Sequence, residues 1–467
     1  MLTRLKVSGF KSMEAAEVRF GPFTCIAGAN GSGKSNLFDA ILFLKHLADW
    51  PFVEAATRIR NSDRQRASLA ALFTRSASGQ ADLIEFDADL LVGATVKDDF
   101  GRVARPKVSF LHYRLGLRYV AASGERPEAI ALAYESLDFV PKGEARRRLG
   151  FPLSQAFFDS VYLGTSRSDF IYMDAHDPAM VRVRQDGAGA GQPISIPLAT
   201  AERTILSNIN TIDRPTALAA RREMQSWSSL HLESSALRQP DDFMAASTVS
   251  PSGAHMPATL DRLKKCDAVS SQLARLLPDV KRLSVDVDER RQIKTLFLEL
   301  VGGVRHEARA LSDGTLRFLA LAIIGADPQA GGLLCIEEPE NGIHPSRIAS
   351  LLHLLTTMGC DTGEAVGPDN PLRQVIVATH SPLFVQKLPL GDVIVARTYK
   401  REGAPLSLFS PVIGTWRDKT GTPLQNDAPV TVAALLDYLD GGPENEHKTD
   451  SQAVLQAYRQ QLDLAVK

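Results

Sequence analysis

The first residues able to do chemistry form the run Gly28-Ala29-Asn30-Gly31-Ser32-Gly33-Lys34-Ser35. Glycines allow the turns that bring successive backbone N–H groups onto a phosphate, and a helix beginning there adds its positive end. At this spacing Lys34 is expected to reach the β- and γ-phosphates of a nucleotide, and the Ser35 hydroxyl to hold Mg²⁺. Residues 23–27 predict a strand and residues 36–47 a helix, which is the setting such a loop requires. The run therefore predicts a nucleotide site.

A second candidate anion site lies far downstream, at Leu311-Ser312-Asp313-Gly314-Thr315, before the apolar helical pattern of residues 316–324. Ser312 stands where a helix N-cap is expected, so the N–H groups of the first turn would be free to meet an anion. Taken alone, this pattern is equally typical of an ordinary well-capped helix.

Two short apolar runs after this helix end in polar residues. Residues 332–336 are followed by the adjacent carboxylates Glu337 and Glu338, and residues 374–379 are followed by His380. Runs of this length predict buried parallel strands. Side chains at the C-terminal ends of parallel strands face the crevice in which α/β sheets bind ligands. We therefore expect these three residues beside the phosphate loop, within reach of a metal ion and water.

The order of these motifs resembles that of the ABC-type ATPase heads in the structural-maintenance-of-chromosomes (SMC) and RecF branch. Within this branch, the chain is most similar to small predicted AAA-type ATPases related to the overcoming-lysogenisation (OLD) family and to the Septu-type anti-phage defence ATPases. The resemblance is carried mainly by residues 5–41 and 310–345. It implies an enzyme that hydrolyses ATP, with ATP and Mg²⁺ as cofactors.

The resemblance also implies roles for single residues. Glu337 corresponds to the Walker B acid, which supports Mg²⁺ together with Ser35. Glu338 corresponds to the carboxylate that polarises the attacking water, and His380 to the switch histidine at the γ-phosphate. Lys34 of the Walker A loop completes the expected catalytic set, because phosphoryl transfer needs mainly positioning and charge neutralisation.

In the family, the run Leu311-Ser312-Asp313-Gly314-Thr315 corresponds to the signature turn. This turn faces the nucleotide held by the opposite subunit, so two chains would pair head to tail around ATP. The glutamine-bearing loop of the family is represented by Asn208, which we expect as a further metal ligand. The residues expected to contact the nucleotide are Gly28, Ala29, Asn30, Gly31, Ser32, Gly33, Lys34, Ser35 and Asn36, with Ser312, Asp313 and Gly314.

The patterns predict an α/β fold, an ABC-ATPase head whose mixed β-sheet carries the P-loop and is flanked by helices. Residues 2–9 and 17–20 predict an antiparallel pair that we expect to begin this core sheet. A β-rich side sheet is expected from three segments of period two, and a helical insertion from helical spacing further on. The period-two segments are 81–92, 107–120 and 129–139, and the helical ones are 204–227 and 259–277.

The chain is therefore divided into an N-terminal ATPase lobe (1–203), a helical insertion (204–300), a C-terminal ATPase lobe (301–440) and a tail (441–467). Residues 143–201 predict an irregular region, in which the arginine run 146–148 and the glycine-alanine tract 187–191 mark loops. Arg221, Arg222, Lys264 and Lys265 of the insertion are candidate contacts for DNA or a partner, although a solvated helical face is the favoured interpretation.

Composition sets further bounds. Lys and Arg number 53 against 54 Asp and Glu, giving a net charge of −1, so there is no bulk attraction to nucleic acid. The four cysteines, Cys25, Cys266, Cys335 and Cys360, show no C-x-x-C pairing. That usage suits a reducing compartment, and no export signal or membrane span is visible, so we expect a cytoplasmic protein.

Three functions are compatible with these features. The first is an ATP-dependent switch in anti-phage defence that forms a homodimer, with room for a higher oligomer and for nucleic-acid binding, and controls a separate nuclease or toxin. A Toprim pattern is not found after His380, and Asp286-Val287-Asp288 reads as part of a strand, so the effector is expected on another protein. The second is an SMC- or RecF-like clamp on DNA. The third, a transporter subunit, is disfavoured by the long insertion.

Overall fold

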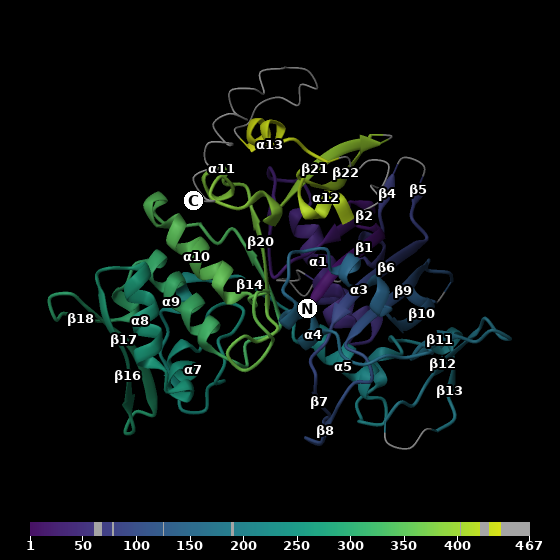
Figure 1. Cartoon of the computed structure of the whole chain (residues 1–467), viewed down its shortest axis with the longest axis horizontal. Helices are drawn as coiled ribbons and strands as arrows, with labels where there is room; N and C mark the ends of the chain where they lie inside the picture. The colour runs from purple at the N-terminus through teal and green to yellow at the C-terminus, as the bar shows by residue number, and fades with distance from the viewer. Residues whose placement is uncertain are drawn as a thin grey trace.

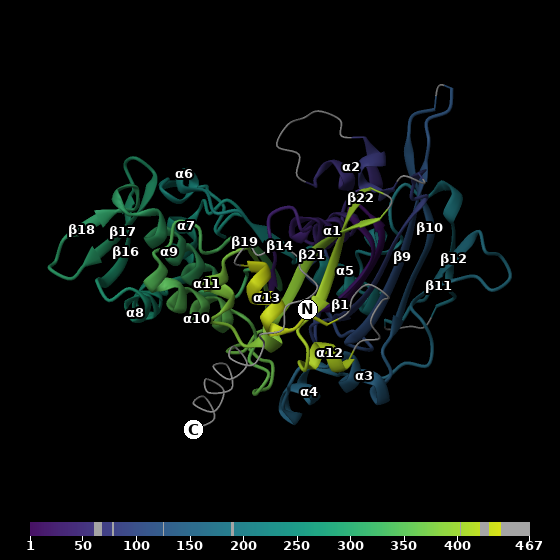
Figure 2. The same cartoon turned by 90° about the horizontal axis from the view of Figure 1, so that it is seen from above.

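A computed structural model of the chain describes residues 1–59, 68–76, 79–124, 126–187, 191–401, 403–420 and 429–439. Two large sheets lie on either side of helix α1 (Lys34–Leu47), and a helical lobe with a small sheet extends to one side (Figures 1 and 2). The predicted α/β class, with a mixed core sheet and a β-rich side sheet, is confirmed. The tail 441–467 and the centre of the tract 187–191 lie outside the described residues.

The six-stranded core sheet carries the phosphate loop. Its strands, in order, are β14 (Ser228–Leu230), β19 (Leu333–Glu337), β20 (Gln374–Thr379), β3 (Phe23–Ala27), β21 (Val393–Arg401) and β22 (Ala404–Pro411). The first five are parallel, and β22 is antiparallel. Successive residues of β3, such as Cys25 and Ile26, point into separate hydrophobic cores on the two faces of the sheet. The three predicted buried strands are thereby confirmed as β3, β19 and β20.

The side sheet has eight antiparallel strands. In order they are β13 (Ile194–Pro197), β12 (Met180–Val183), β11 (Ile171–Met173), β10 (Ala129–Phe139), β9 (Phe110–Val120), β6 (Leu83–Leu91), β1 (Leu2–Phe10) and β2 (Met13–Arg19). The three period-two segments are confirmed as β6, β9 and β10. Alternation of this kind suits an antiparallel sheet with one face on the core and one face in solvent.

The expectation that residues 143–201 are irregular is wrong. This region adds strands β11 to β13 and two helices, α3 (Lys142–Leu149) and α4 (Gln155–Val161). The arginine run 146–148 lies in α3, where Ala145 and Leu149, four residues apart, are buried. The strands escaped prediction because each has only three or four residues, too few to show a period.

The N-terminal hairpin was predicted correctly as a pair but assigned to the wrong sheet. Strands β1 and β2 pair antiparallel, with Leu5 opposite Val18, yet both belong to the side sheet. The reason lies in burial. Strand β1 alternates buried and half-buried residues, so it needs a sheet with one open face, whereas every residue of β3 is buried.

Helix α1 fills the space between the two large sheets. Its residues Leu37, Phe38 and Ile41 share one core with side-sheet residues such as Val7 and core-sheet residues such as Ile26. The Phe43 ring lies 5.8 Å from the Phe10 ring and 6.1 Å from the Phe86 ring, centroid to centroid, within the range of favourable aromatic pairs. This packing on both sides fixes the start of α1, and with it the phosphate loop.

The C-terminal half builds the second lobe, seen to the left in Figures 1 and 2. Helix α5 (Pro215–Gln225) leads to this lobe. The helices of the lobe are α6 (Ser234–Leu237), α7 (Met256–Leu263), α8 (Cys266–Leu276), α9 (Asp313–Ala326) and α10 (Ile348–Met358). A small sheet adds β15 (Asp241–Asp242), β16 (Val280–Asp288), β17 (Ile293–Leu300) and β18 (Arg305–Glu307). Residues 204–300 thus hold the predicted helices α5, α7 and α8, the predicted strand at 286–288, and also β14 of the core sheet.

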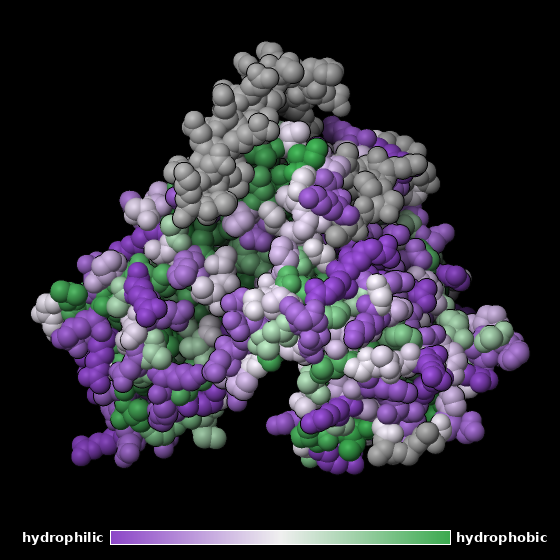
Figure 3. Space-filling model, viewed as in Figure 1, coloured by the Kyte–Doolittle hydropathy of each residue, from purple (hydrophilic) through white to green (hydrophobic). Residues whose placement is uncertain are grey.

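The remaining elements are short. They are α2 (Phe52–Thr57), α11 (Pro382–Val385), α12 (Trp416–Thr420), α13 (Val432–Leu439), β4 (Arg75–Ser76), β5 (Gly79–Gln80), β7 (Val96–Lys97) and β8 (Val103–Ala104). Among the described residues, no helix combines the length and the apolar character that crossing a bilayer requires. The face of the molecule in Figure 3 is mostly hydrophilic over both lobes.

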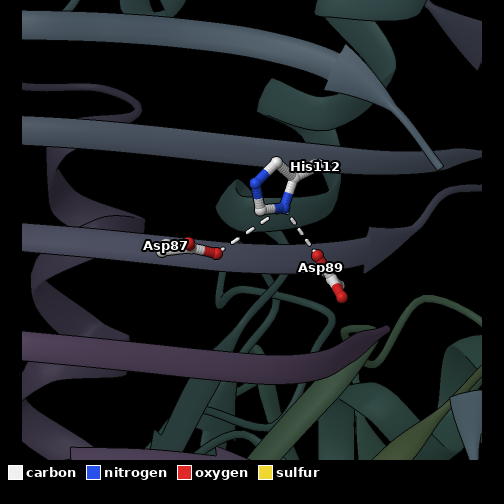
Figure 4. A group of neighbouring side chains, drawn as sticks. All are labelled: Asp87, Asp89 and His112. Atoms are coloured by element: carbon white, nitrogen blue, oxygen red, sulfur yellow. Dashed lines mark hydrogen bonds and ion pairs between the residues drawn. The ribbon is translucent and has the colours of Figure 1, made fainter. Parts of the chain in front are cut away.

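A network of charges ties α3 to the outer face of the side sheet. His112 Nδ1 lies 2.7 Å from Asp89 Oδ1 and 3.6 Å from Asp87 Oδ1 (Figure 4). Three such side chains could hold a metal ion, but guanidinium groups already bind the same oxygens, with Arg4 2.6 Å from Asp87 and Arg148 3.1 Å from Asp89. Burial alone would raise the pKa of Asp89, but His112 and the two arginines lower it. We interpret the cluster as an ion-pair network.

The carboxyl group of Glu135, on the inner face of the side sheet, is wholly buried. It accepts hydrogen bonds from the Tyr113 hydroxyl (3.0 Å) and from the backbone N–H groups of Ile205 (2.6 Å) and Leu206 (2.9 Å). Burial raises the pKa of Glu135 to about 7, although these donors oppose the shift. The protonation of the Glu135 carboxyl is therefore coupled to the hydrogen bonds that hold the segment after residue 204 in position.

We predict that this group makes stability depend on pH. Between about pH 4.5, its usual pKa, and about pH 7, the folded protein holds a proton that the unfolded chain has released. The free energy of unfolding is therefore expected to fall on the order of 3 kcal/mol across that range. Urea unfolding at several pH values should show this slope in the wild type and lack it in Glu135→Gln. Equal slopes in the two proteins would contradict the assignment.

Candidate functional site

The phosphate loop connects the end of β3 to the first residue of α1, as predicted. Gly31 and Gly33 have φ angles of 82° and 91°, a region that side chains disfavour. Ala29, Asn30 and Gly31 are exposed at the tip of the loop. The Ser32 hydroxyl is buried and has no hydrogen-bond partner among the described residues. A buried hydroxyl without a partner in such a loop is the kind of group that a phosphate would satisfy.

Lys34 is held against the loop that it follows. Its ammonium group donates to the carbonyl oxygens of Gly28 (2.6 Å) and Ala29 (3.0 Å), and the side chain is almost fully buried. Burial lowers the pKa of Lys34, while the charges of Glu338, Glu337 and, more weakly, Glu340 oppose that shift. The carboxylates are therefore close enough to act on the lysine electrostatically.

Two serines distant in the sequence line the base of the loop and were not predicted. Ser12 Oγ lies 2.6 Å from Ser407 Oγ and accepts a 2.6 Å hydrogen bond from Asn36 Nδ2. A Cβ atom on Gly33 would come within 1.8 Å of Ser407 Oγ. Ser407 belongs to β22 at the far end of the chain, so no local pattern could have shown that it packs here.

The two carboxylates stand where the strand ends, as expected. Glu337 is the last residue of β19, opposite Ala378, and the Glu338 N–H donates to the Ala378 carbonyl at 2.8 Å. Glu338 has a φ angle of 48°, an uncommon conformation for a residue other than glycine. Its Oε2 lies 2.6 Å from His380 Nδ1. Strained backbone of this kind is typical of functional positions, where surrounding structure holds it.

Strand β20 joins this acid pair to the phosphate loop. The Gly28 N–H donates to the carbonyl of Thr379, the residue before His380, at 3.1 Å. The Thr379 hydroxyl donates to the buried carboxyl of Glu340. Burial raises the pKa of Glu340, and the hydrogen bond from Thr379 opposes that shift. The structure thus brings Lys34, Glu338 and His380 to one edge of the core sheet, as the sequence predicted.

The donor set at this edge suits Mg²⁺. The Ser35 hydroxyl and the Glu337 carboxylate are oxygen ligands of the kind that Mg²⁺ prefers, and Mg²⁺ usually binds one or two such protein groups together with nucleotide phosphates and water. Both side chains are partly buried rather than fully exposed. Glu337 and Ser35 are therefore suited to hold Mg²⁺ beside a bound nucleotide.

Asn208 is not brought to this edge. It follows Thr204, whose hydroxyl donates to the carbonyl of Leu47 at the opposite end of α1. Leu47 is the last of the fourteen residues of α1, so it lies about 20 Å from Lys34 at 1.5 Å per residue. The exposed His231 instead follows β14, whose residue Leu230 pairs with Ile336 of β19. Strand β14 is too short for its period to have revealed this histidine.

The signature turn forms the predicted capped helix start in the second lobe. Ser312 is the N-cap of α9, and its Oγ accepts from the Thr315 N–H at 3.3 Å. Ser312 and Asp313 are exposed. A Cβ on Gly314 would come within 3.0 Å of the Gly342 carbonyl, so the turn packs against the loop that follows the Walker B acids. Helix α9 lies in the left lobe of Figure 1, away from α1.

This fold and site define a P-loop nucleotide-binding protein. Residues 1–86 match the family model of the "RecF/RecN/SMC N terminal domain", which contains the phosphate loop. Residues 180–386 match the model "AAA domain, putative AbiEii toxin, Type IV TA system". This matched segment contains the signature turn, Glu337, Glu338 and His380. Neither match spans half of the chain, and together they support a likeness to ABC-type ATPases of the SMC and RecF branch. No curated protein matches it.

Solved structures that match include SMC heads at low identity. The SMC head bound to the C-terminal winged-helix domain of ScpA is 14% identical, with 87% of this chain and 97% of that chain covered and a TM-score of 0.46. The Pyrococcus furiosus SMC head with an extended coiled coil, bound to the ScpA C-terminal domain, is 14% identical. The match covers 87% of this chain and 96% of that chain, with a TM-score of 0.41. The Thermotoga maritima SMC head is 13% identical, and the match covers 88% of this chain and 98% of that chain, with a TM-score of 0.40.

We predict that Gly33→Ala weakens nucleotide binding at least tenfold, because its Cβ would meet Ser407 within 1.8 Å. Gly31→Ala is the matched control, since it shares the positive φ angle but has no atom within 4 Å of its Cβ. Titration with a fluorescent ATP analogue should show a clearly larger loss for Gly33→Ala, partly restored by adding Ser407→Gly. Equal losses for the two glycine variants would show that backbone strain, not the contact, matters.

Proposed function

We propose that this protein is a Mg²⁺-dependent ATPase that dimerises head to tail on ATP, with the nucleotide between the phosphate loop of one chain and the signature turn of its partner. The observation that carries the proposal is the position of the signature. Its capped turn is exposed, but it lies in the lobe away from α1 of the same chain (Figure 1). A second copy of the chain would supply that turn.

The residues at the sheet edge have distinct roles in this proposal. Lys34 would exchange its two carbonyl contacts for phosphate oxygens, and Ser35 and Glu337 would hold Mg²⁺, which would supply charge neutralisation at the phosphates. Glu338 orients and polarises the attacking water. His380, 2.6 Å from Glu338, holds that carboxylate in place and reaches toward the γ-phosphate.

We further propose that closing and opening of this dimer controls a separate effector, a nuclease or a toxin, in anti-phage defence. The resemblance to OLD-related and Septu-type ATPases supports this role, and so does the match of residues 180–386 to a model described as a putative AbiEii toxin of a type IV system. Loop and domain closure around a nucleotide is a common way for hydrolysis to drive such switching.

A clamp on DNA is less well supported by the charges of the helical segment. Arg221 donates to the carbonyls of Ala48 and Ile209, and the guanidinium group of Arg222 pairs with Asp99. Both side chains are thus engaged within the chain. If the protein nevertheless gripped DNA, its affinity would fall steeply with salt because bound phosphates release counterions.

We expect Glu338→Gln to bind ATP and accumulate as dimers, with hydrolysis reduced on the order of 10²- to 10³-fold, because water activation is lost while charge repulsion at the phosphates falls. Lys34→Ala should lose ATP binding and stay monomeric. Size-exclusion chromatography with light scattering, with and without Mg²⁺-ATP, measures the dimerisation of both variants. A phosphate-release assay measures their rates of hydrolysis. Turnover at the wild-type rate in Glu338→Gln would remove Glu338 from its role.

Mixing two inactive variants tests whether the sites are shared between chains. Ser312→Arg should block closure but leave nucleotide binding by the monomer intact, and Lys34→Ala should empty its own site. One composite site in the mixed dimer would keep Lys34 from one chain and Ser312 from the other. We therefore expect hydrolysis to return on mixing. Absence of any recovery would argue against shared sites.

A further inference from the structure

The signature turn carries a negative charge where the proposal requires it to receive a phosphate. Asp313 is the first residue of α9, and its side chain is about half exposed. An acid in the first turn stabilises a helix because it faces the positive end of the helix dipole. The same position would oppose an incoming triphosphate, because like charges a few ångströms apart repel.

A single arginine from another helix neutralises this acid. Arg238 directly follows α6, and its Nη2 lies 2.5 Å from Asp313 Oδ1 and donates to the Leu311 carbonyl at 3.0 Å. Its Nη1 donates to the Ser234 carbonyl at 3.1 Å. The guanidinium group thus spans the chain on both sides of Ser312. The hydrogen bond from Arg238, helped by Ser234, lowers the pKa of Asp313, so the acid remains ionised and paired.

The segment that carries Arg238 begins at the edge of the core sheet. Strand β14 ends beside β19 and the Walker B acids, and the chain runs from His231 to Arg238 in eight residues. Backbone N–H groups fix this path, with His231 donating to Pro251 at 2.8 Å and Glu233 to Ser252 at 2.9 Å. Leu237 is fully buried. Arg238 therefore reaches the signature from a fixed support.

We propose that Arg238 is a positioning residue that neutralises Asp313 and holds its carboxylate aside, so that the N–H groups of the signature turn can receive the phosphate of a nucleotide bound to a second copy of the chain. This inference rests on the composite site proposed above. The phosphate is bound by the backbone of the turn, and the Asp313 side chain takes no part in binding it.

The competing explanation is an ordinary surface ion pair, which contributes little on average. Two features distinguish this pair. Its guanidinium group also binds the Leu311 carbonyl next to the N-cap, and the acid lies at the end of a helix that has an exposed turn. Arg317, one turn along α9, also acts on Asp313, and the effect of Arg238 on the pKa of this acid is larger.

The test uses full-length Glu338→Gln protein as the parent, because it should form stable ATP dimers. In this background we expect Arg238→Ala to raise the dimer dissociation constant roughly tenfold, because Asp313 is then uncompensated. Adding Asp313→Asn to Arg238→Ala should restore dimerisation, because the uncompensated charge is removed. The penalty of Arg238→Ala should shrink as salt rises from 50 to 500 mM, roughly the range over which surface charges become screened.

Three controls keep the outcomes distinct. Binding of a fluorescent ATP analogue by the isolated monomer should be unchanged in Arg238→Ala, since the signature serves the partner's nucleotide. Arg291→Ala removes an exposed partner of Asp288 on the small sheet and should leave dimerisation unchanged. Arg238→Lys should recover part of the loss, because the charge returns without the paired donors.

The results separate the two proposals. If Arg238→Ala dimerises as tightly as the parent, or if Asp313→Asn fails to rescue it, Arg238 does not act by neutralising the acid and the inference is overturned. If the Glu338→Gln parent itself stays monomeric with Mg²⁺-ATP, the composite site is wrong, and the inference falls with it. Rescue by Asp313→Asn together with the salt dependence supports the inference. If Arg238 only stabilised the fold, removing the charge of Asp313 would not restore dimerisation, and the loss in Arg238→Ala would not depend on salt.

Discussion

The parallel register of three neighbouring strands is the constraint on which the site depends. Pairing sets Glu337 opposite Ala378 and Thr379 opposite Ala27, so the acids, His380 and the phosphate loop leave the sheet at one edge. A shift of one residue would turn every side chain of the moved strand to the opposite face. That shift is prevented because the two faces belong to separate hydrophobic cores, each filled by alternate residues of these strands. Burial on both faces thus fixes the chemistry at the edge.

The same register explains the unusual backbone at Glu338. Its N–H must reach the Ala378 carbonyl at 2.8 Å, while the chain has to leave the sheet at once toward Glu340. The positive φ angle allows both, at a cost on the order of 1–2 kcal/mol that the surrounding packing offsets. The result is a carboxylate aimed at His380 rather than into solvent. Backbone strain and side-chain placement therefore have one origin.

The sequence was sufficient where a signal was local. The glycine loop, the N-cap at Ser312 and the buried strands each depend on residues within a short window, and the structure forms all of them. It was insufficient where contacts join distant segments. Ser407 packs on the phosphate loop from the far end of the chain, and His231 reaches the edge through a strand of three residues. The sheet that the N-terminal hairpin joins also depended on partners elsewhere in the chain.

Charge balance connects the two halves of the proposed site. Three carboxylates, those of Glu337, Glu338 and Glu340, act on Lys34, so this edge is negative before any nucleotide arrives. A triphosphate can settle there only if cations offset both its own charge and that of the acids, which one lysine cannot do. On the phosphate-loop side, Mg²⁺ would supply the additional positive charge. On the signature side the helix dipole must do so, and it can act only while Asp313 is neutralised, which makes the pairing of that acid a condition for closure around ATP.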